Sequence, residues 1–291
     1  MSTMRHESEA ARKSLLRELP AVPPPRMVSR MPVTMNSTPN AKDPARLPGG
    51  IDVVLFDVGH TLVHTNLQNA WQVVNEVTAA VHRQVAALGF TPPALSRYIR
   101  TAKWRFLSAA VWSRIIRREV QVIEMIRHAH ARMGIHLDSD QTRDLAVHGA
   151  IAIWDLFSVD PDASAMLGEL SRRGYRLGLI SNTWLPGILF DGYLKHEGLL
   201  DYFPLRVYSS EFRYMKPDRR IFDHALNELK VTPQQCMFVG DRLDNDVRGP
   251  ARLGMRTIHF AVKPRRFWQR GAPDHTIHRL SEVPDVLSSL A

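Results

Sequence analysis

The stretch VVLFDVGHTLV at residues 53–63 is the most informative part of this sequence. Its first four residues, Val53–Phe56, are apolar and predict a buried strand. The run ends at a carboxylate, Asp57, and a carboxylate that ends a buried strand needs a partner. Gly59 and Thr61 follow within four residues, so the strand leads into a short turn. We therefore expect a functional role for Asp57.

From residue 51 onward, with one interruption, short apolar runs alternate with helical stretches. Strands are expected at 52–57, 175–181, 205–209, 236–240 and 255–260, and helices at 161–173, 186–197, 218–229 and 246–253. Such alternation predicts an α/β fold with a doubly wound (Rossmann-like), mostly parallel sheet that has helices on both faces. Ligands bind beyond the carboxyl ends of the strands in such folds, and Asp57, Ser181 and Asp241 fall at those ends.

Residues 66–157 interrupt this alternation, because they contain no good strand. They are expected to form helices at 66–88, 94–117, 119–133 and 140–157. The sequence therefore predicts an all-helical cap subdomain at 66–157, inserted into a core domain made of 51–65 and 158–291. Residues 1–50 are rich in proline and have no sustained apolar period, so we expect a disordered tail.

The composition bounds the class of protein. The chain has 291 residues, of which 44% are hydrophobic and 23% charged, as is typical of a globular protein with a sizeable core. No apolar run approaches the roughly 18 residues of a membrane span, so we expect no membrane segment. The single cysteine, Cys236, excludes an intramolecular disulfide and fits a reducing compartment, for which we expect the cytoplasm. The sequence carries no signal for the oligomeric state.

Four short stretches carry the chemistry, and each lies at an expected strand end or helix start. They are LFDVGHTLV (55–63), GLISNTW (178–184), YMKPDRRIF (214–222) and MFVGDRLDNDVRGPARLGM (237–255). In this order they resemble the haloacid dehalogenase-like (HAD) superfamily of hydrolases. The resemblance covers about residues 51–290, including the helical cap and a closing strand and helix in PDHTIHRLSEVPDVL.

The resemblance implies a role for each matching residue. Asp57 matches the nucleophile that attacks phosphorus and forms an aspartyl-phosphate, and Lys216 matches the lysine that offsets negative charge on both. Ser181 matches the residue whose hydroxyl holds a phosphoryl oxygen. Asn182 beside it joins the substrate-binding set, as does Thr61, which matches the residue that orders the turn after the nucleophile.

The resemblance also implies a Mg²⁺ site. Its ligands would be Asp57, the backbone carbonyl of Gly59, Asp241 and Asp246, of which the last steers a metal-bound water. Oxygen ligands of this kind suit a hard cation that retains waters. We accordingly expect a magnesium-dependent phosphatase that acts on a small phosphorylated metabolite.

Gly59 departs from the family pattern. HAD phosphatases usually place a second aspartate there, which protonates the leaving alcohol, and such assistance is worth about 10²–10⁴-fold in rate. His60 and His64 are nearby candidates for a substitute. Members without this acid include 2-haloacid dehalogenases and phosphonate hydrolases, the latter using a cap lysine, for which Lys103 is the one candidate. A dehalogenase-like hydrolase and a catalytically weakened scaffold with a binding or regulatory role are therefore the alternatives.

The expected cap is strongly basic on one stretch, and the whole chain has a formal net charge of +9. No acid lies between Glu76 and Glu119, where the basic residues are Arg83, Arg97, Arg100, Lys103, Arg105, Arg114, Arg117 and Arg118. We favour a solvated basic face with Trp104, Phe106 and Trp112 in the cap core, and next an anionic substrate. We do not expect a nucleic-acid partner, although basic helices with interleaved aromatic residues can serve that purpose.

Overall fold

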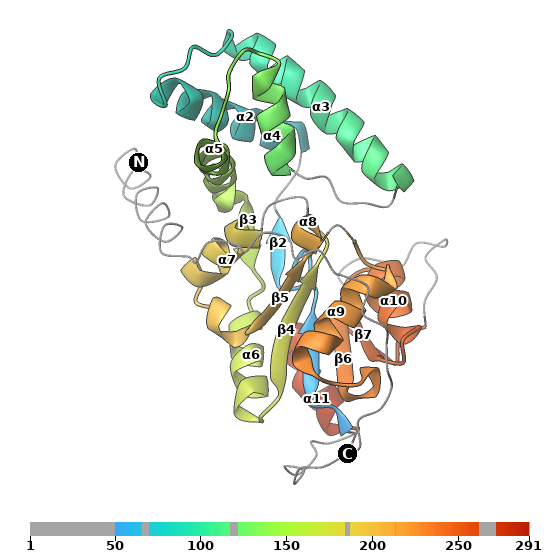
Figure 1. Ribbon diagram of the computed structural model, residues 1–291. Coiled ribbons are helices and arrows are strands. Elements are labelled where there is room, and N and C mark those ends of the chain that lie inside the picture. Colours follow the sequence, from blue (N-terminus) through green and yellow to red (C-terminus); the bar gives the residue numbers. More distant parts are fainter. Residues whose placement is uncertain are drawn as a thin grey trace.

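A six-stranded parallel sheet forms the centre of the molecule (Figure 1). The computed structural model describes residues 50–65, 70–116, 122–183, 187–212, 214–261 and 272–290. The strand order is β5-β4-β1-β6-β7-β8. The strands are β1 (Val53–Phe56), β4 (Arg176–Ser181), β5 (Leu205–Tyr208), β6 (Cys236–Gly240), β7 (Arg256–Phe260) and β8 (His275–Ile277). The predicted strands and the predicted doubly wound fold are confirmed.

Helices cover both faces of this sheet, because alternate residues of β1 point to opposite sides. Val54 and Phe56 belong to one apolar cluster, which includes residues of α6 (Ala163–Arg172), α7 (Gly187–His196) and α11 (Val283–Ser288). Val53 and Leu55 belong to another, which includes residues of α9 (Arg219–Leu229). The apolar run of β1 is thus buried on both faces. Its continuous hydrophobicity is explained by this position in the middle of the sheet.

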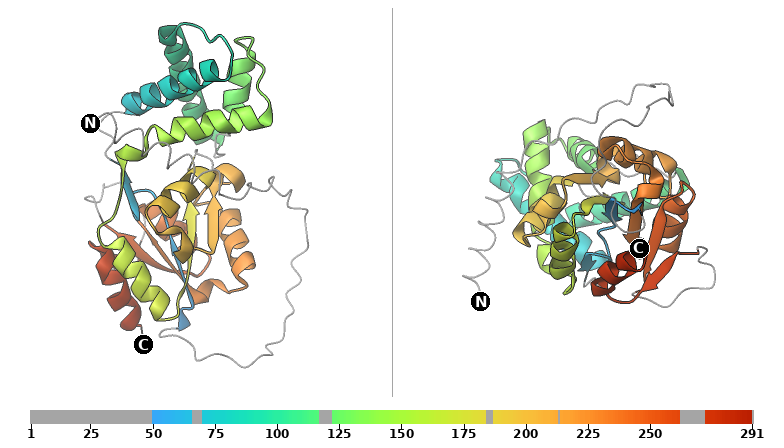
Figure 2. Two further views of the ribbon diagram at one scale, coloured as in Figure 1. Left: turned by 90° about the vertical axis from the view of Figure 1, so that its left-hand side faces the viewer. Right: turned by 90° about the horizontal axis from the view of Figure 1, so that it is seen from below.

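Between β1 and β4 the chain forms a group of helices that we call the helical insertion. It consists of α2 (Ala70–Ala87), α3 (Leu95–Ile116), α4 (Val122–Ala131) and α5 (Ser139–Ile151). Val85 and Leu145 are among the residues of its own apolar cluster. In Figures 1 and 2 the insertion lies beyond the carboxyl ends of the central strands.

Two short antiparallel strands, β2 (Val63–Thr65) and β3 (Phe157–Val159), connect the insertion to the sheet. The expected helix at 140–157 is therefore wrong at its end, because the helix stops at Ile151 and Phe157 begins a strand. A three-residue strand that depends on a partner more than 90 positions away leaves no local pattern. The proposed tail at 1–50 lies outside the described residues except for Gly50.

The remaining elements are short. They are α8 (Ser209–Phe212), α10 (Arg248–Ala251), the π-helix η5 (Leu243–Val247) and the 3₁₀ turns η2 (Trp154–Leu156), η3 (Leu200–Tyr202), η4 (Pro233–Gln235) and η6 (Leu280–Glu282). The helix expected at 246–253 is thus divided into a π-helical turn and a short α-helix. No helix in the described part of the chain combines the length and apolar character of a membrane span.

Candidate active site

Three polar residues lie at one edge of the sheet because their strands are neighbours. β1 lies between β4 and β6, and Phe56 pairs with Leu179 on one side and with Val239 on the other. Asp57 is the next residue after β1, Ser181 ends β4, and Asp241 follows β6. The predicted convergence of these strand ends is therefore present in the structure.

Lys216 reaches this edge from the loop before α9 and lies between two carboxylates. Its Nζ atom is 2.9 Å from Oδ1 of Asp57 and 2.7 Å from Oδ1 of Asp246. Lys216, Asp57 and Asp246 are only 2%, 7% and 0% exposed. Charges removed from water to this extent require each other, since an unpaired buried charge is strongly unfavourable.

The side chain of Asn182 holds the backbone of Lys216. Its amide nitrogen donates a hydrogen bond to the carbonyl oxygen of Lys216 at 2.8 Å, and its oxygen accepts one from the amide of Lys216 at 2.7 Å. These two bonds fix the loop that carries the lysine onto the end of β4. The sequence assigns Asn182 to substrate binding and gives no sign of this contact with a residue 34 positions away.

Asp57, Asp241 and Asp246 form a cluster whose nearest ligand atoms all lie within 4.8 Å of one another. Burial raises the pKa of Asp57 above its ordinary value, although Lys216 acts in the opposite direction. Burial and the charge of Asp246 raise the pKa of Asp241 to about 6, and burial raises that of Asp246 to about 6. Burial alone would lower the pKa of Lys216, but the charges of Asp246 and Asp57 together raise it.

The cluster fits a divalent cation. Three carboxylates share one lysine, so negative charge is in excess, and Oδ1 of Asp241 is buried without a hydrogen-bond partner among the described residues. A hard cation with oxygen ligands would supply the missing positive charge. Asp57, Asp241 and Asp246 are the residues that could hold it.

The loop after β6 is shaped to bring Asp246 into the cluster. The backbone amide of Arg242 donates to Oδ2 of Asp246 at 2.9 Å, within the turn that leads into η5. A Cβ atom at Gly240 would lie 2.5 Å from Cβ of Asp246, so only glycine leaves room there. His259 on β7 donates from Nε2 to the carbonyl of Asp241 at 3.1 Å. Sequence reasoning missed Gly240 and His259, of which only Gly240 stands next to a recognised motif residue.

The turn after Asp57 is closed by backbone hydrogen bonds to Val58. The amides of Thr61, Leu62 and Val63 all donate to its carbonyl oxygen. Thr61 is fully buried, and its hydroxyl has no hydrogen-bond partner among the described residues. A Cβ atom at Gly59 would meet nothing within 4 Å, so the position of the missing acid faces open space.

Two of the other candidate side chains, those of His64 and Lys103, have partners outside the cluster. Nε2 of His64 lies 2.8 Å from Oδ2 of Asp160, where β2 and β3 meet the core. His60 adopts a left-handed backbone conformation with φ of 60°. Nζ of Lys103 lies 5.7 Å from the ring centre of Trp71, within the helical insertion. The structure therefore brings together Asp57, Lys216, Asp241 and Asp246, with Ser181 and Asn182 at the adjoining strand end.

Solved structures share this fold. The chain aligns over 83% of its length with all of a 2-haloacid dehalogenase from Pseudomonas syringae pv. Tomato, with a TM-score of 0.59 and 24% identity. It also aligns over 81% of its length with 98% of a HAD phosphatase from Thermococcus onnurineus, with a TM-score of 0.51 and 22% identity. At such identities the likeness shows the fold alone.

Curated relatives are more similar in sequence but are matched only in part. The chain is 33% identical over 139 residues to glyceraldehyde 3-phosphate phosphatase of Methanopyrus kandleri, covering 45% of this chain and 57% of that protein. It is 35% identical over 123 residues to phosphoserine phosphatase of Thermus thermophilus, covering 42% and 49%. The chain thus spans about half the length of these relatives. The sequence profile of the haloacid dehalogenase-like hydrolases matches residues 51–254, which is most of the chain, and the protein belongs to that hydrolase family.

Proposed function

We propose that the protein is a magnesium-dependent phosphatase that acts on a small phosphorylated metabolite through an aspartyl-phosphate. The observation that carries the proposal is the buried cluster in which Lys216 lies between Asp57 and Asp246, with Asp241 beside them. The phosphatase activity named for two partly matched relatives supports it. We also propose that 51–65 and 158–291 form the core domain and that residues 66–157, with the helical insertion, form its cap.

The proposed reaction has two steps. A carboxylate oxygen of Asp57 forms a bond to phosphorus, the bond from phosphorus to the ester oxygen breaks, and the leaving group departs with the electron pair and takes up a proton. Water then attacks phosphorus, releases inorganic phosphate and restores the carboxylate. Lys216 neutralises charge in both steps, and the hydroxyl of Ser181 donates to a phosphoryl oxygen. Mg²⁺ held by Asp57, Gly59, Asp241 and Asp246 would further neutralise the phosphoryl group.

Substrate choice follows from the absence of an acid at Gly59. Proton donation to the leaving group matters most for alkyl phosphates, whose alcohols are poor leaving groups. We therefore infer a preference for acyl or aryl phosphates. A dehalogenase-like activity is the weaker alternative, because the acidic cluster gives a divalent cation three carboxylates. The cytoplasmic location stays a prediction.

An aryl-phosphate assay with and without Mg²⁺ tests the proposal. We expect turnover that requires the metal, and that is lost in Asp57→Asn and Asp246→Asn. Asp244→Asn is the matched control, because Asp244 lies in the same turn as Asp246 but is exposed. Halide release from a 2-haloacid without metal would support the dehalogenase. Failure to turn over any phosphate ester, by a folded protein that binds Mg²⁺, would support the scaffold.

Gly59→Asp tests the account of the missing acid. The new side chain meets open space, and the backbone at Gly59 does not need glycine, so the variant is expected to fold. Turnover of alkyl phosphates should rise by about 10²-fold or more, while aryl-phosphate turnover changes less. An unchanged or lower alkyl-phosphate rate in the folded variant would contradict the account.

A further inference from the structure

The exposed large apolar side chains of the described residues all belong to the helical insertion. These are Trp71 on α2 and Leu95 and Trp104 on α3, which are 41%, 41% and 69% exposed. The sequence favours a cap with Trp104 in its core, and this expectation is wrong. Trp71 and Trp104 line the same groove, and exposed apolar side chains that adjoin one another on a folded protein point to an interaction site.

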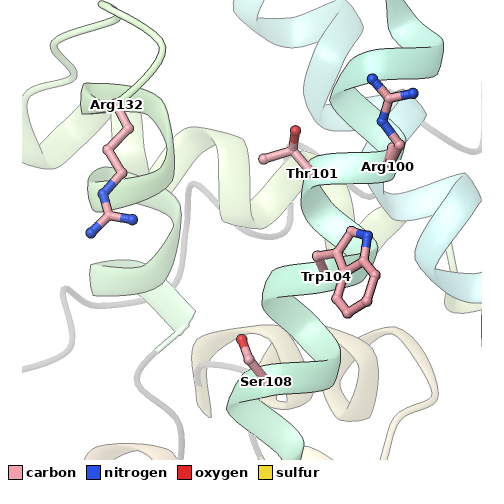
Figure 3. A pocket seen from close by; sticks show the side chains of 5 residues that line it. All are labelled: Arg100, Thr101, Trp104, Ser108 and Arg132. Carbon is pink, nitrogen blue, oxygen red and sulfur yellow. The ribbon is translucent and has the colours of Figure 1, made fainter.

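Two grooves flank Trp104 and share Arg100. The first has a volume of about 440 Å³ and is lined by Arg100, Thr101, Trp104, Ser108 and Arg132. Figure 3 shows Arg132 across from α3, on the α4 side of this groove. The second, of about 430 Å³, is lined by Trp71, Ser96, Ile99, Arg100, Lys103 and Trp104. The indole ring of Trp104 therefore lines both grooves, and the indole of Trp71 lines the second.

The grooves are positively charged. Their lining includes Arg100, Lys103 and Arg132 and no carboxylate. Neither Arg100 nor Arg132 forms an ion pair with a described residue, and both are exposed. The sequence of α3 contains no aspartate or glutamate. The ligand that complements this surface is therefore an extended anion with flat apolar groups.

We propose that this aromatic and basic surface binds single-stranded nucleic acid, a partner that the sequence alone did not lead us to expect. Bases stack on the indoles of Trp104 and Trp71, and phosphates contact Arg100, Lys103 and Arg132. Single-strand binding elsewhere combines the same two elements, a basic groove that follows the backbone and aromatic rings on which bases stack. Two adjoining open grooves suit a polymer, whereas a mononucleotide would be more fully enclosed. The high net charge of +9 favours association with a polyanion.

Binding is measured with the full-length protein and a fluorescein-labelled twelve-residue oligothymidylate, by fluorescence anisotropy at 50 and 200 mM salt. We expect binding that weakens with salt, and a loss of about tenfold or more in Trp104→Ala. Trp104→Phe should retain most of the affinity, because a ring remains for stacking. Arg100→Gln and Arg132→Gln should each reduce the salt dependence, by roughly 0.7 in the slope of log K against log salt.

Arg172→Gln is the control, since it removes an exposed arginine on α6, outside the insertion. It should leave both affinity and salt dependence unchanged. The proposal is overturned if the oligonucleotide does not bind at 50 mM salt, or if Trp104→Ala binds like the wild type. It is also overturned if thymidine monophosphate binds as tightly as the oligonucleotide, or if vesicles containing phosphatidylserine bind through the same three side chains and the oligonucleotide does not.

Discussion

Lys216→Met removes the one positive charge that the structure places between Asp57 and Asp246, while keeping a side chain of similar length. The Nζ atom lies 2.9 and 2.7 Å from the two carboxylates, and all three groups are buried. Loss of one partner from a buried ion pair costs about 3–5 kcal/mol, because the other charge is left uncompensated. We expect a loss of this size in the free energy of unfolding at pH 7.5 without metal.

The loss should depend on pH, because a carboxyl group can take up a proton instead of staying charged. With an unfolded-state pKa of about 3.9, keeping one carboxyl protonated costs about 5 kcal/mol at pH 7.5 and about 1.5 kcal/mol at pH 5.0. The folded-state pKa of these acids is raised, so their contribution to stability is favourable at low pH and is lost as the pH rises. The effect of the substitution should therefore shrink to about 1.5 kcal/mol at pH 5.0.

Urea unfolding in EDTA at the two pH values measures both quantities. Lys230→Met is the control, since Lys230 is exposed and should change stability by less than about 0.5 kcal/mol. Mg²⁺ should recover part of the loss at pH 7.5, because it replaces the missing positive charge. A loss of the same size at both pH values would refute the electrostatic reasoning and indicate a packing defect instead.

Three further predictions concern the same site. Gly240→Ala would place a Cβ atom 2.5 Å from Cβ of Asp246, so Asp246 would have to move. The concentration of Mg²⁺ needed for half-maximal turnover should therefore rise by about tenfold or more. An unchanged Mg²⁺ titration would contradict this. Mg²⁺ should raise the melting temperature more at pH 7.5 than at pH 5.0. The pKa values of Asp241 and Asp246 are raised to about 6, so at pH 5.0 both acids are mostly protonated and cannot act as ligands. Equal shifts of the melting temperature in calorimetry would show that these acids do not bind the metal. Asn182→Ala removes two hydrogen bonds to the backbone of Lys216. It should destabilise the protein by about 1–3 kcal/mol and should lower kcat more than it raises KM. A rise in KM alone, at unchanged stability, would instead indicate that Asn182 binds the substrate.

Much of the fold could be predicted because its signals are local. Continuous apolar runs such as Val53–Phe56 identify buried parallel strands, and the alternation of strands and helices then indicates a doubly wound sheet. The convergence of Asp57, Ser181 and Asp241 could also be predicted, since the carboxyl ends of parallel strands share one edge.

The features that could not be predicted depend on distant partners. The bonds between Asn182 and Lys216 join positions 34 residues apart, and an asparagine that begins a loop has the same local pattern whether it binds a ligand or a backbone. The exposure of Trp104 was missed for a related reason, because an aromatic residue in a helix is usually part of a core. Only the arrangement of α2, α3 and α4 shows that no element in the described part of the chain covers its ring.

The position of β1 in the sheet has a consequence for biosynthesis. Among the described strands it is the first to be synthesised, yet Val53 pairs with Arg176 and Cys236, more than 120 and 180 residues later. Contacts of such long range form slowly, and an apolar strand that waits for its partners is exposed to aggregation. Asp57 cannot join the buried cluster until β6 and the turn after it, which carry Asp241 and Asp246, have been added. Synthesis must therefore have passed Asp246 before the charged centre can form.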